Sequence, residues 1–349
     1  MHLTSSCSLI KSNIKSFSLE NWELIWYSLI TVLGIIGNSV VMIVILLSKN
    51  INRTSLFHIA IFSLAFADFM VSLLSLPTYI MSTDTFQNYH PKNVSGDLMC
   101  IFITGFSLPY WFIDASVYLL VFISIERWNA ILYKKCLLLQ LKSTKSKIAT
   151  MVLIYFLALI TESLCAAFFV YDPSNKQFGN FCKYFLDKTS DKIILTLVIF
   201  TLDTAVPVVI VSFCFYKISL SLKKIGIFLG NSMKVNKVDI IHIRKVKTTK
   251  TIKILAVAFC ICILPNRILF LLAFENVPIL CWNSSISQVF VLMRLSNSFI
   301  NPLIFCFQSK QFRTNLSMVF YRLYKRKSIA SSRGKQQSNG YEKLPNITF

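Results

Sequence analysis

The segment LMCIFITGFSLPYWFIDASVYLLVFISI, residues 98–125, decides the fold of this chain, and Glu126-Arg127-Trp128 follows it directly. Its 28 residues include one charge, Asp114, before a carboxylate and a guanidinium begin a basic loop. A helix of ~20 apolar residues crosses the ~30 Å hydrocarbon core of a bilayer. The segment therefore predicts a membrane-spanning helix. The Glu126–Arg127 pair at its end predicts a switch that a partner can open.

Six further stretches share this length and apolar character: residues 24–47, 56–81, 148–170, 193–216, 254–274 and 286–307. Apolar side chains make up 55% of the 349 residues and charged ones only 15%, which is too apolar for a soluble domain of this size. In lipid each stretch must be helical, because only bonding within the segment satisfies its backbone. The sequence therefore predicts an all-α membrane protein, a seven-transmembrane helix bundle.

The expected organisation is an extracellular N-terminus (1–23), the membrane domain (24–307), an amphipathic surface helix (308–326) and a disordered cytoplasmic tail (327–349). In 308–326, apolar residues alternate with Lys and Arg at helical spacing, which favours a short eighth helix on the membrane surface. The basic loop 217–253 reads as extensions of the fifth and sixth helices.

The distribution of charge sets the expected orientation. With the N-terminus outside, the inner segments hold 27 of the 36 Lys and Arg and only three acids, whereas the outer segments hold seven bases and eight acids. This asymmetry follows the positive-inside rule, and the basic excess should face anionic inner-leaflet lipid. We therefore expect a multi-pass plasma-membrane protein with an extracellular N-terminus, and we do not expect the net charge of +21 to bind nucleic acid.

Each apolar stretch after the first contains one charged residue: Asp68, Asp114, Glu162, Asp203, Arg267 and Arg294. A charge at membrane depth is costly unless it is paired or hydrated, so each is a candidate functional residue. Asp114 and Asp203 either neutralise the two arginines or contact a cationic group. For Glu162 the main alternative is a plain ion pair that orients helices. A further set of polar groups lies at the depth of Asp68 and could help it to hold a sodium ion or a proton, or merely pack helices: Asn38, Ser116, Asn297, Ser298 and Asn301.

Four of the ten cysteines fall in the predicted outer parts, namely Cys7, Cys100, Cys182 and Cys281. An even number in an oxidising compartment suggests two disulfides. Glycosylation sequons begin at Asn93 and Asn283 in predicted outer loops, while those at Asn52 and Asn346 lie inside and should stay bare.

Short motifs follow one another along the predicted helices. They are Gly37-Asn38, Leu64-Ala65-Phe66-Ala67-Asp68, Ser124-Ile125-Glu126-Arg127-Trp128, Pro207, Phe259-Cys260-Ile261-Cys262-Ile263-Leu264-Pro265, Asn297-Ser298-Phe299-Ile300-Asn301-Pro302-Leu303-Ile304-Phe305 and Phe312-Arg313. With these motifs in this order, the chain resembles the rhodopsin-like (class A) G-protein-coupled receptors over residues ~24–325.

The resemblance implies roles for these residues. Arg127 would leave Glu126 on activation and meet a heterotrimeric G protein. Asp68 would bind a sodium ion, which is the only cofactor expected. Asn301 and Pro302 would transmit movement along the seventh helix. Cys100 and Cys182 would form the family disulfide, which leaves Cys7 and Cys281 as a second candidate pair. The protein would be a receptor and not an enzyme, with arrestin and receptor kinases as further candidate partners.

The chain also departs from the family pattern. Ile263 stands where the family has a tryptophan before the helix-six proline, Pro265, and Trp128 and Phe305 replace usual tyrosines. Lys245 occupies the place of an acid that faces Arg127 in some members, so that ionic lock is not expected. The stretch from Cys100 to Arg127 is longer than usual and contains Pro109, which predicts a bulge or local unwinding.

The expected ligand is a neuropeptide or peptide hormone, because the mixed charges of the outer loops and outer bundle resemble the peptide-receptor branch. The polar contacts to test first are Glu275, Asp187, Asp191, Arg267 and Arg294, with Asp114 and Asp203 as further candidates. One alternative is a receptor of the same fold for a small anionic metabolite or lipid, bound by Arg267 and Arg294. A transporter is disfavoured because no internal repeat is visible.

Overall fold

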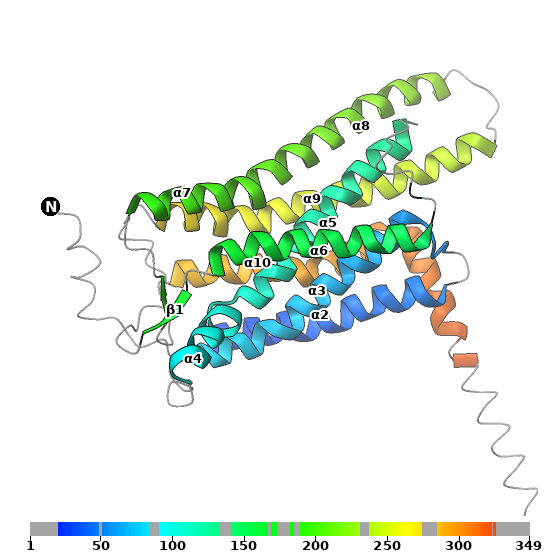
Figure 1. Cartoon of the computed structure of the whole chain (residues 1–349). Helices are drawn as coiled ribbons and strands as arrows, with labels where there is room; N and C mark the ends of the chain where they lie inside the picture. Colours follow the sequence, from blue (N-terminus) through cyan, green and yellow to red (C-terminus); the bar gives the residue numbers. More distant parts are fainter. Residues whose placement is uncertain are drawn as a thin grey trace, which may run out of the picture.

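Seven of the helices that the structure describes are long and apolar enough to cross a membrane, and they form one bundle (Figure 1). The computed structural model describes residues 20–48, 51–83, 91–132, 141, 143–166, 169–172, 182–184, 189–230, 237–273, 285–322 and 324–325. The predicted fold class is therefore confirmed.

Five of the seven spans are single helices: α2 (Asn21–Leu47), α3 (Leu56–Met81), α6 (Thr144–Ala166), α9 (Lys237–Ala273) and α10 (Ser285–Gln308). The bounds of α3 agree with the predicted stretch. Helix α9 starts well before its apolar stretch, and the fifth span continues to Gly230, so the loop 217–253 does extend two helices as expected. Helix α6 ends at Ala166, and Val170, which we predicted to be helical, lies in a strand.

The third span is not one continuous helix. It begins as α4 (Asn93–Met99), continues through the π-helical turn η3 (Cys100–Thr104) and restarts as α5 (Ser107–Leu132). Between the last two, Phe106 has a φ of 62°, in the left-handed region that breaks a helix. The membrane-spanning part starts at Ser107, nine residues later than Leu98. The predicted local unwinding is confirmed, and Pro109 lies in the first turn of α5, where proline is tolerated.

The fifth span is also composite. Helices α7 (Thr189–Phe200) and α8 (Val206–Gly230) are joined by a second π-helical turn, η5 (Thr201–Ala205). Such turns insert a residue into the helix and are frequent at functional sites. This turn places Asp203, which is 1% exposed, in the interior of the bundle.

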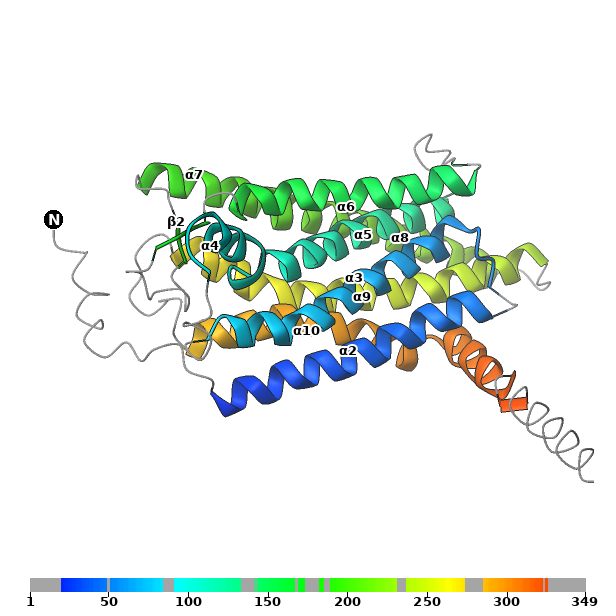
Figure 2. The same ribbon diagram turned by 60° about the horizontal axis from the view of Figure 1, so that its bottom comes forward.

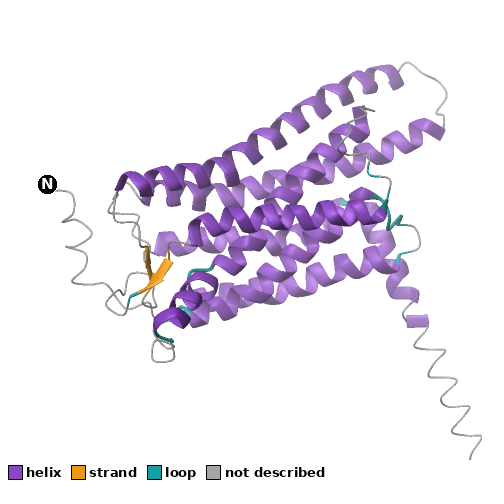
Figure 3. Ribbon diagram, in the orientation of Figure 1, coloured by secondary structure: helices purple, strands orange, loops and turns teal. Residues whose placement is uncertain are grey.

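A small hairpin lies at one end of the bundle (Figure 3). Strands β1 (Phe169–Tyr171) and β2 (Cys182–Tyr184) pair antiparallel with Tyr171 opposite Cys182. A disulfide joins Cys182 to Cys100 at the start of η3, as the family resemblance implies. We call this end of the bundle the disulfide end.

The opposite end carries Arg127 and a short helix over residues 310–322, which diverges from the bundle (Figure 2). This helix falls within the predicted range 308–326. The Arg313 guanidinium donates to the carbonyls of Cys306 and Phe307 at 3.1 and 2.6 Å. These carbonyls lack partners within α10 because they lie in its last turn, so Arg313 both caps α10 and fixes the start of the short helix.

Side chains on α2 show how the sequence separates the core from the lipid. Tyr27, Ile30, Gly34, Asn38 and Val41 recur every three or four residues and face inward, while apolar residues between them stay exposed. A Cβ added to Gly34 would lie 1.9 Å from Ser72 Oγ, and one on Gly37 would lie 2.7 Å from Pro302 Cγ. Glycine at both positions therefore allows α2 to approach α3 and α10 closely.

Candidate functional site

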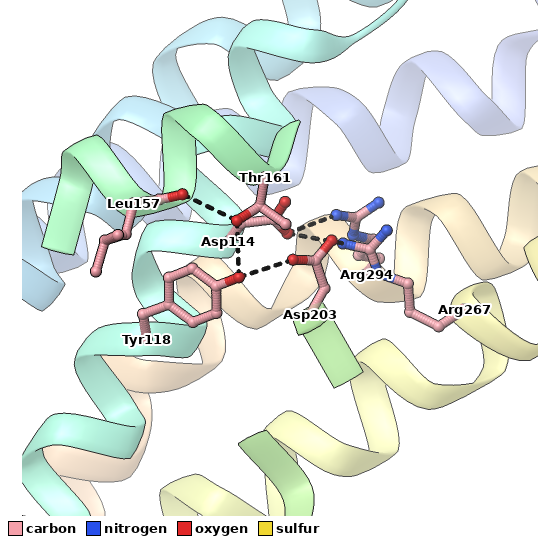
Figure 4. A network of polar contacts seen from close by, with 7 residues as sticks. All are labelled: Asp114, Tyr118, Leu157, Thr161, Asp203, Arg267 and Arg294. Atoms are coloured by element: carbon pink, nitrogen blue, oxygen red, sulfur yellow. Dashed lines mark hydrogen bonds and ion pairs between the residues drawn. The ribbon is translucent and has the colours of Figure 1, made fainter. Parts of the chain in front are cut away.

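Four buried charges from four spans meet inside the bundle (Figure 4). Asp114 lies seven residues after the start of α5 and Arg267 six residues before the end of α9, so the four lie toward the disulfide end. The Nη2 atom of Arg267, on α9, donates two hydrogen bonds. One goes to Asp114 Oδ1 on α5 at 2.8 Å and the other to Asp203 Oδ2 on η5 at 3.0 Å. Arg294 on α10 donates to the same Asp114 oxygen at 3.0 Å. All four are at most 6% exposed. We call Asp114, Asp203, Arg267 and Arg294 the charge cluster.

Aromatic and hydroxyl groups complete the charge cluster. The Arg294 guanidinium carbon lies 3.9 Å from the centre of the Tyr110 ring, within range of a cation–π contact. The Tyr118 hydroxyl donates to Asp203 Oδ1 at 3.0 Å and also contacts Thr161 Oγ1 at 2.9 Å, which links α6 to the cluster (Figure 4). Sequence alone left the partners of the two arginines open, and the structure shows that aspartates neutralise them.

Glu162 behaves differently from the other intramembrane charges. It is buried, with 7% of its surface exposed, yet it forms no hydrogen bond or ion pair within the described part of the chain. It lies next to Thr161 on α6 and within electrostatic range of all four members of the charge cluster. Among the described residues, Glu162 therefore does not form the helix-orienting ion pair that was one interpretation of it, and the ion pairs of both arginines there are with aspartates.

A second polar group surrounds Asp68 in the middle of α3. Asn301 Nδ2 donates to Asp68 Oδ2 at 2.6 Å and Ser116 Oγ donates to Asp68 Oδ1 at 3.0 Å. Ser72, one turn further along α3, donates to Ser298 Oγ at 3.1 Å, and Asn38 Nδ2 donates to the Ser298 carbonyl at 2.9 Å. Five residues predicted from the sequence, Asp68, Ser116, Asn301, Ser298 and Asn38, thus belong to one network joining α2, α3, α5 and α10.

Asn297, the remaining residue predicted at this depth, is 3% exposed, and its Oδ1 has no hydrogen-bond partner among the described residues. An unsatisfied oxygen one turn before Asn301, on the same helix, suits a cation ligand, because a buried carbonyl oxygen is costly to leave without a partner. The donor set therefore fits a sodium ion, with Asp68, Ser116 and Asn297 as the residues that would hold it.

At the opposite end of the bundle, Arg127 is held by its own neighbour. Arg127 Nε and Nη2 donate to the two carboxylate oxygens of Glu126 at 2.5 and 2.6 Å. The guanidinium carbon also lies 3.9 Å from the centre of the Phe57 ring on α3. The local pairing expected from the sequence is present, and only 9% of Arg127 is exposed.

A cavity of about 330 Å³ adjoins Arg127. Its walls are mostly apolar and come from α2, α3, α9, α10 and the helix over 310–322; Ile45, Phe57, His58, Ile252 and Phe312 are among the lining residues. A space of this size at the end of a helix bundle can receive side chains of a partner protein once Arg127 moves.

The residues predicted to transmit movement between the two ends of the bundle are packed within it. Pro265 and Pro302 lie inside α9 and α10, where each removes one backbone hydrogen bond. Ile263 is 1% exposed within the core, and Phe305 packs on Phe312 with ring centres 6.1 Å apart. Trp128 makes an edge contact with Phe213 on α8 at 5.7 Å. The side chains of Ile263, Trp128 and Phe305 therefore pack within the bundle, although the family pattern has a different residue at each of these positions.

Several predicted residues lie outside the described part of the chain: Cys7, Asp187, Glu275, Cys281 and Asn283. The side chain of Lys245 is also outside it. Asp191 is exposed at the start of α7, twelve residues before Asp203, and accepts a hydrogen bond from Ser190 at 3.2 Å. It takes no part in the ion pairs of the charge cluster. Asn93 is exposed at the first residue of α4.

One buried acid escaped the sequence analysis. Glu23, placed in the N-terminal segment, lies within α2 and is 5% exposed. The Tyr79 hydroxyl donates to it at 2.7 Å, and the Tyr79 ring stacks on Tyr27 with centres 4.1 Å apart. The signal that could have found it is the position of Glu23 one turn before Tyr27 and two turns before Ile30, on the inward face of the same helix.

A helix bundle with buried charges near one end and a restrained arginine beside a cavity at the other defines a seven-helix membrane receptor. The family model described as "7 transmembrane receptor (rhodopsin family)" matches residues 37–305. The chain belongs to this family, which is one of signalling receptors and not of enzymes or transporters.

Individual relatives agree with this assignment. The chain is 28% identical to galanin receptor 2b of Danio rerio over 303 residues, covering 84% of this chain and 73% of that protein. It is 22% identical to the allatostatin-A receptor of Bombyx mori over 304 residues, covering 85% and 79%. It is 24% identical to the substance-P receptor of Aquarana catesbeiana over 328 residues, covering 88% and 74%. A crystal structure of squid rhodopsin superimposes with a TM-score of 0.67 at 18% identity, covering 88% of this chain and 91% of that one.

Proposed function

We propose that this receptor is activated by an extracellular peptide, a neuropeptide or peptide hormone, and passes the signal to a heterotrimeric G protein. One observation carries the coupling between its two ends: α5 takes part in all three polar sites. It supplies Asp114 to the charge cluster, Ser116 to the Asp68 network and Arg127 beside the cavity. Asp114 and Arg127 are 13 residues apart, so about 20 Å of one rigid element joins the two ends.

The peptide part of the proposal rests on the relatives and on the charge cluster. Galanin, allatostatin-A and substance P, as named in those relatives, support a peptide ligand for this chain. A small anionic metabolite is the second candidate, because the cluster contains two arginines. Both arginines are already neutralised by aspartates, so such a ligand would have to displace a buried carboxylate, which is costly.

The proposed mechanism starts at the disulfide end, which faces the extracellular side together with the N-terminus. A ligand that competes for Asp114 or Asp203 weakens the contacts of Arg267 and so frees α9 from α5 and η5. Movement of α9 widens the cavity, because Thr251 and Ile252 of α9 line it together with Arg127. Arg127 then exchanges Glu126 for the G protein. A sodium ion at Asp68 favours the resting arrangement, and arrestin and receptor kinases acting on the C-terminal tail end the signal.

The test is a peptide-library screen on cells that express the receptor, read out by dissociation of the G-protein subunits. Cells expressing Arg127→Ala at equal surface level are the control, and active peptides should give no response there. A receptor that responds to carboxylated metabolites and to no peptide would refute the peptide assignment in favour of the second candidate.

A further inference from the structure

The cavity beside Arg127 is present while Arg127 is still paired with Glu126. Its volume of about 330 Å³ is at the lower end of the range for small-molecule sites, roughly 300–1,000 Å³. Its described walls come from α2, α3, α5, α9, α10 and the helix over residues 310–322. This space can therefore hold a small molecule in contact with both α9 and Arg127, the two parts that move in the proposed mechanism.

One polar side chain of the cavity wall lacks a partner. Asn315, on the helix over 310–322, is 3% exposed and lines the cavity. Its side-chain amide forms no hydrogen bond with any residue that the structure describes. Its polar atoms are nevertheless not sealed from solvent, so the little surface that Asn315 keeps opens into the cavity. An otherwise buried amide without a partner is costly, and it indicates a position where a further molecule binds.

Arg127 offers a second donor to the same cavity. Its Nε and Nη2 atoms donate to Glu126, and its guanidinium lies over the ring of Phe57, which also lines the cavity. A guanidinium has five N–H donors, of which Glu126 accepts two. The Nη1 group has no hydrogen-bond partner among the described residues. A ligand can therefore bond to Arg127 without displacing Glu126.

The rest of the wall selects against charged ligands. Arg127 is the only Lys, Arg, Asp or Glu among its described residues, and Glu126 already neutralises this charge. A charged molecule would lose its hydration here and gain no unpaired opposite charge. Most of the other lining side chains are apolar, among them Val41, Ile45, Ile61, Ile252, Phe305 and Phe312. Apolar rings with a carbonyl-type oxygen suit both these walls and the two donors.

We propose that this cavity is a binding site for an uncharged, largely apolar molecule with carbonyl-type acceptors for the Asn315 amide and Arg127 Nη1. The bound molecule packs α9, through Ile252, against α2 and the helix over 310–322, and it keeps Arg127 beside Glu126. Because signalling in the proposed mechanism needs α9 to move and Arg127 to leave Glu126, the occupant is an inhibitor. Only this inhibitory effect rests on the proposed function, whereas the binding site does not.

A binding experiment tests the site without any agonist. Purified full-length receptor in lipid nanodiscs is titrated with benzyl phenyl ketone, with bibenzyl, which lacks the carbonyl oxygen, and with the anion diphenylacetate. The melting temperature is followed, because a ligand that binds the folded state raises it. We expect the ketone to bind about tenfold more tightly than bibenzyl, as for one added hydrogen bond, and diphenylacetate to bind no better than bibenzyl.

Two variants separate recognition from partitioning into lipid, which is the same for every variant. Asn315→Leu removes the unpartnered amide, so the ketone should lose most of its advantage over bibenzyl while the ligand-free melting temperature does not fall. Ile45→Trp fills the cavity and should weaken both compounds. Ile43→Trp, on the same helix but 43% exposed, is the matched control and should bind as the parent does. Equal affinities of ketone and bibenzyl, or ketone binding unchanged in Asn315→Leu and Ile45→Trp, would overturn the proposal.

The inhibitory effect is tested on G-protein activation. A peptide found active in the screen is applied at a saturating concentration, and the ketone is then added. It should lower the maximal rate of nucleotide exchange in the parent and in Ile43→Trp, and much less in Asn315→Leu. Ketone binding without any active peptide would keep the site and refute the peptide function. Full signalling with the cavity saturated would keep the function and refute the inhibitory role of the occupant.

Discussion

Arg127 is held by two contacts of different kinds, a bidentate pair with Glu126 and the face of the Phe57 ring. The first comes from the adjacent residue and the second from a ring on α3, so a partner that binds Arg127 has to replace both. Charge-assisted pairs of this kind are worth about 1.5–3 kcal/mol each, which a docked protein surface can supply.

Replacing Arg127 with alanine should therefore abolish G-protein activation while leaving the receptor at the cell surface. The expected residual signal is that of untransfected cells, measured by subunit dissociation with surface level determined by antibody. Lys310→Ala removes an exposed base from the same end of the molecule and should signal normally. Full signalling by the Arg127 variant would exclude Arg127 as the contact that couples the receptor to the G protein.

Asp68 accepts hydrogen bonds from Asn301 and Ser116, and the side-chain oxygen of Asn297 has no donor in the part of the chain that the structure describes. If sodium binds here, NaCl should raise the melting temperature of the purified receptor more than the same concentration of choline chloride. Asp68→Asn should remove most of this difference, because it removes the charge that attracts the ion. Asp191→Asn, a change at an exposed acid, should preserve it. If the Asp68 variant keeps the sodium effect, Asp68 serves helix packing only.

At the scale of elements, the charge cluster ties α9 to α5 and η5 through one residue. Arg267 alone bridges Asp114 and Asp203, while Arg294 attaches α10 to the same Asp114 oxygen. The aspartates sit on two different spans, and η5 is the π-helical turn that carries one of them inward. The contact between these helices therefore depends on ion pairs as well as on apolar packing.

Arg267→Gln should destabilise the receptor by about 3 kcal/mol or more, because it removes the cation from the buried Asp203 and leaves Asp114 with Arg294 alone. The measurement is the loss of folded protein on heating, followed for the purified receptor. The double variant Arg267→Gln/Asp203→Asn should be more stable than the single one, since it removes one of the uncompensated charges. Lys253→Gln changes an exposed base on the same helix and should have little effect. Additive losses in the double variant would argue against the ion pair.

The composite third span shows where sequence reasoning about elements reaches its limit. Hydropathy placed its start at Leu98, but the helix is interrupted at Gly105–Phe106 and only Ser107 begins the spanning part. Pro109 and the long spacing from Cys100 signalled an interruption. The position of the interruption depends on contacts that anchor α4 and η3 to the hairpin. These are the Cys100–Cys182 disulfide and the hydrogen bond that the Tyr171 amide donates to Asp97 Oδ1 at 2.7 Å.

At the scale of the whole molecule, the two sequons within the described residues, both exposed, report the orientation of the bundle. Asn93 begins α4 at the disulfide end, whereas Asn52 lies at the opposite end and accepts hydrogen bonds from Thr54. If the disulfide end is extracellular, Asn93→Gln should lower the apparent mass of the receptor on a gel by the mass of one glycan. Asn52→Gln should leave the apparent mass unchanged. Glycosidase treatment should abolish the difference between Asn93→Gln and the parent. Loss of a glycan from the Asn52 variant instead would reverse the orientation.

The sequence by itself determined the seven spans, the resemblance to the receptor family and the depth of each intramembrane charge. Membrane spans can be read locally, because a lipid environment demands an apolar helix of fixed length wherever the chain crosses. The pairing of charges is not local. Asp114 and Arg294 are 180 residues apart, and only the packing of the helices decided that Arg294 would bind this acid and that Glu162 would have no ion-pair partner among the described residues. That choice depends on helix rotation and side-chain reach, which no single stretch of sequence contains.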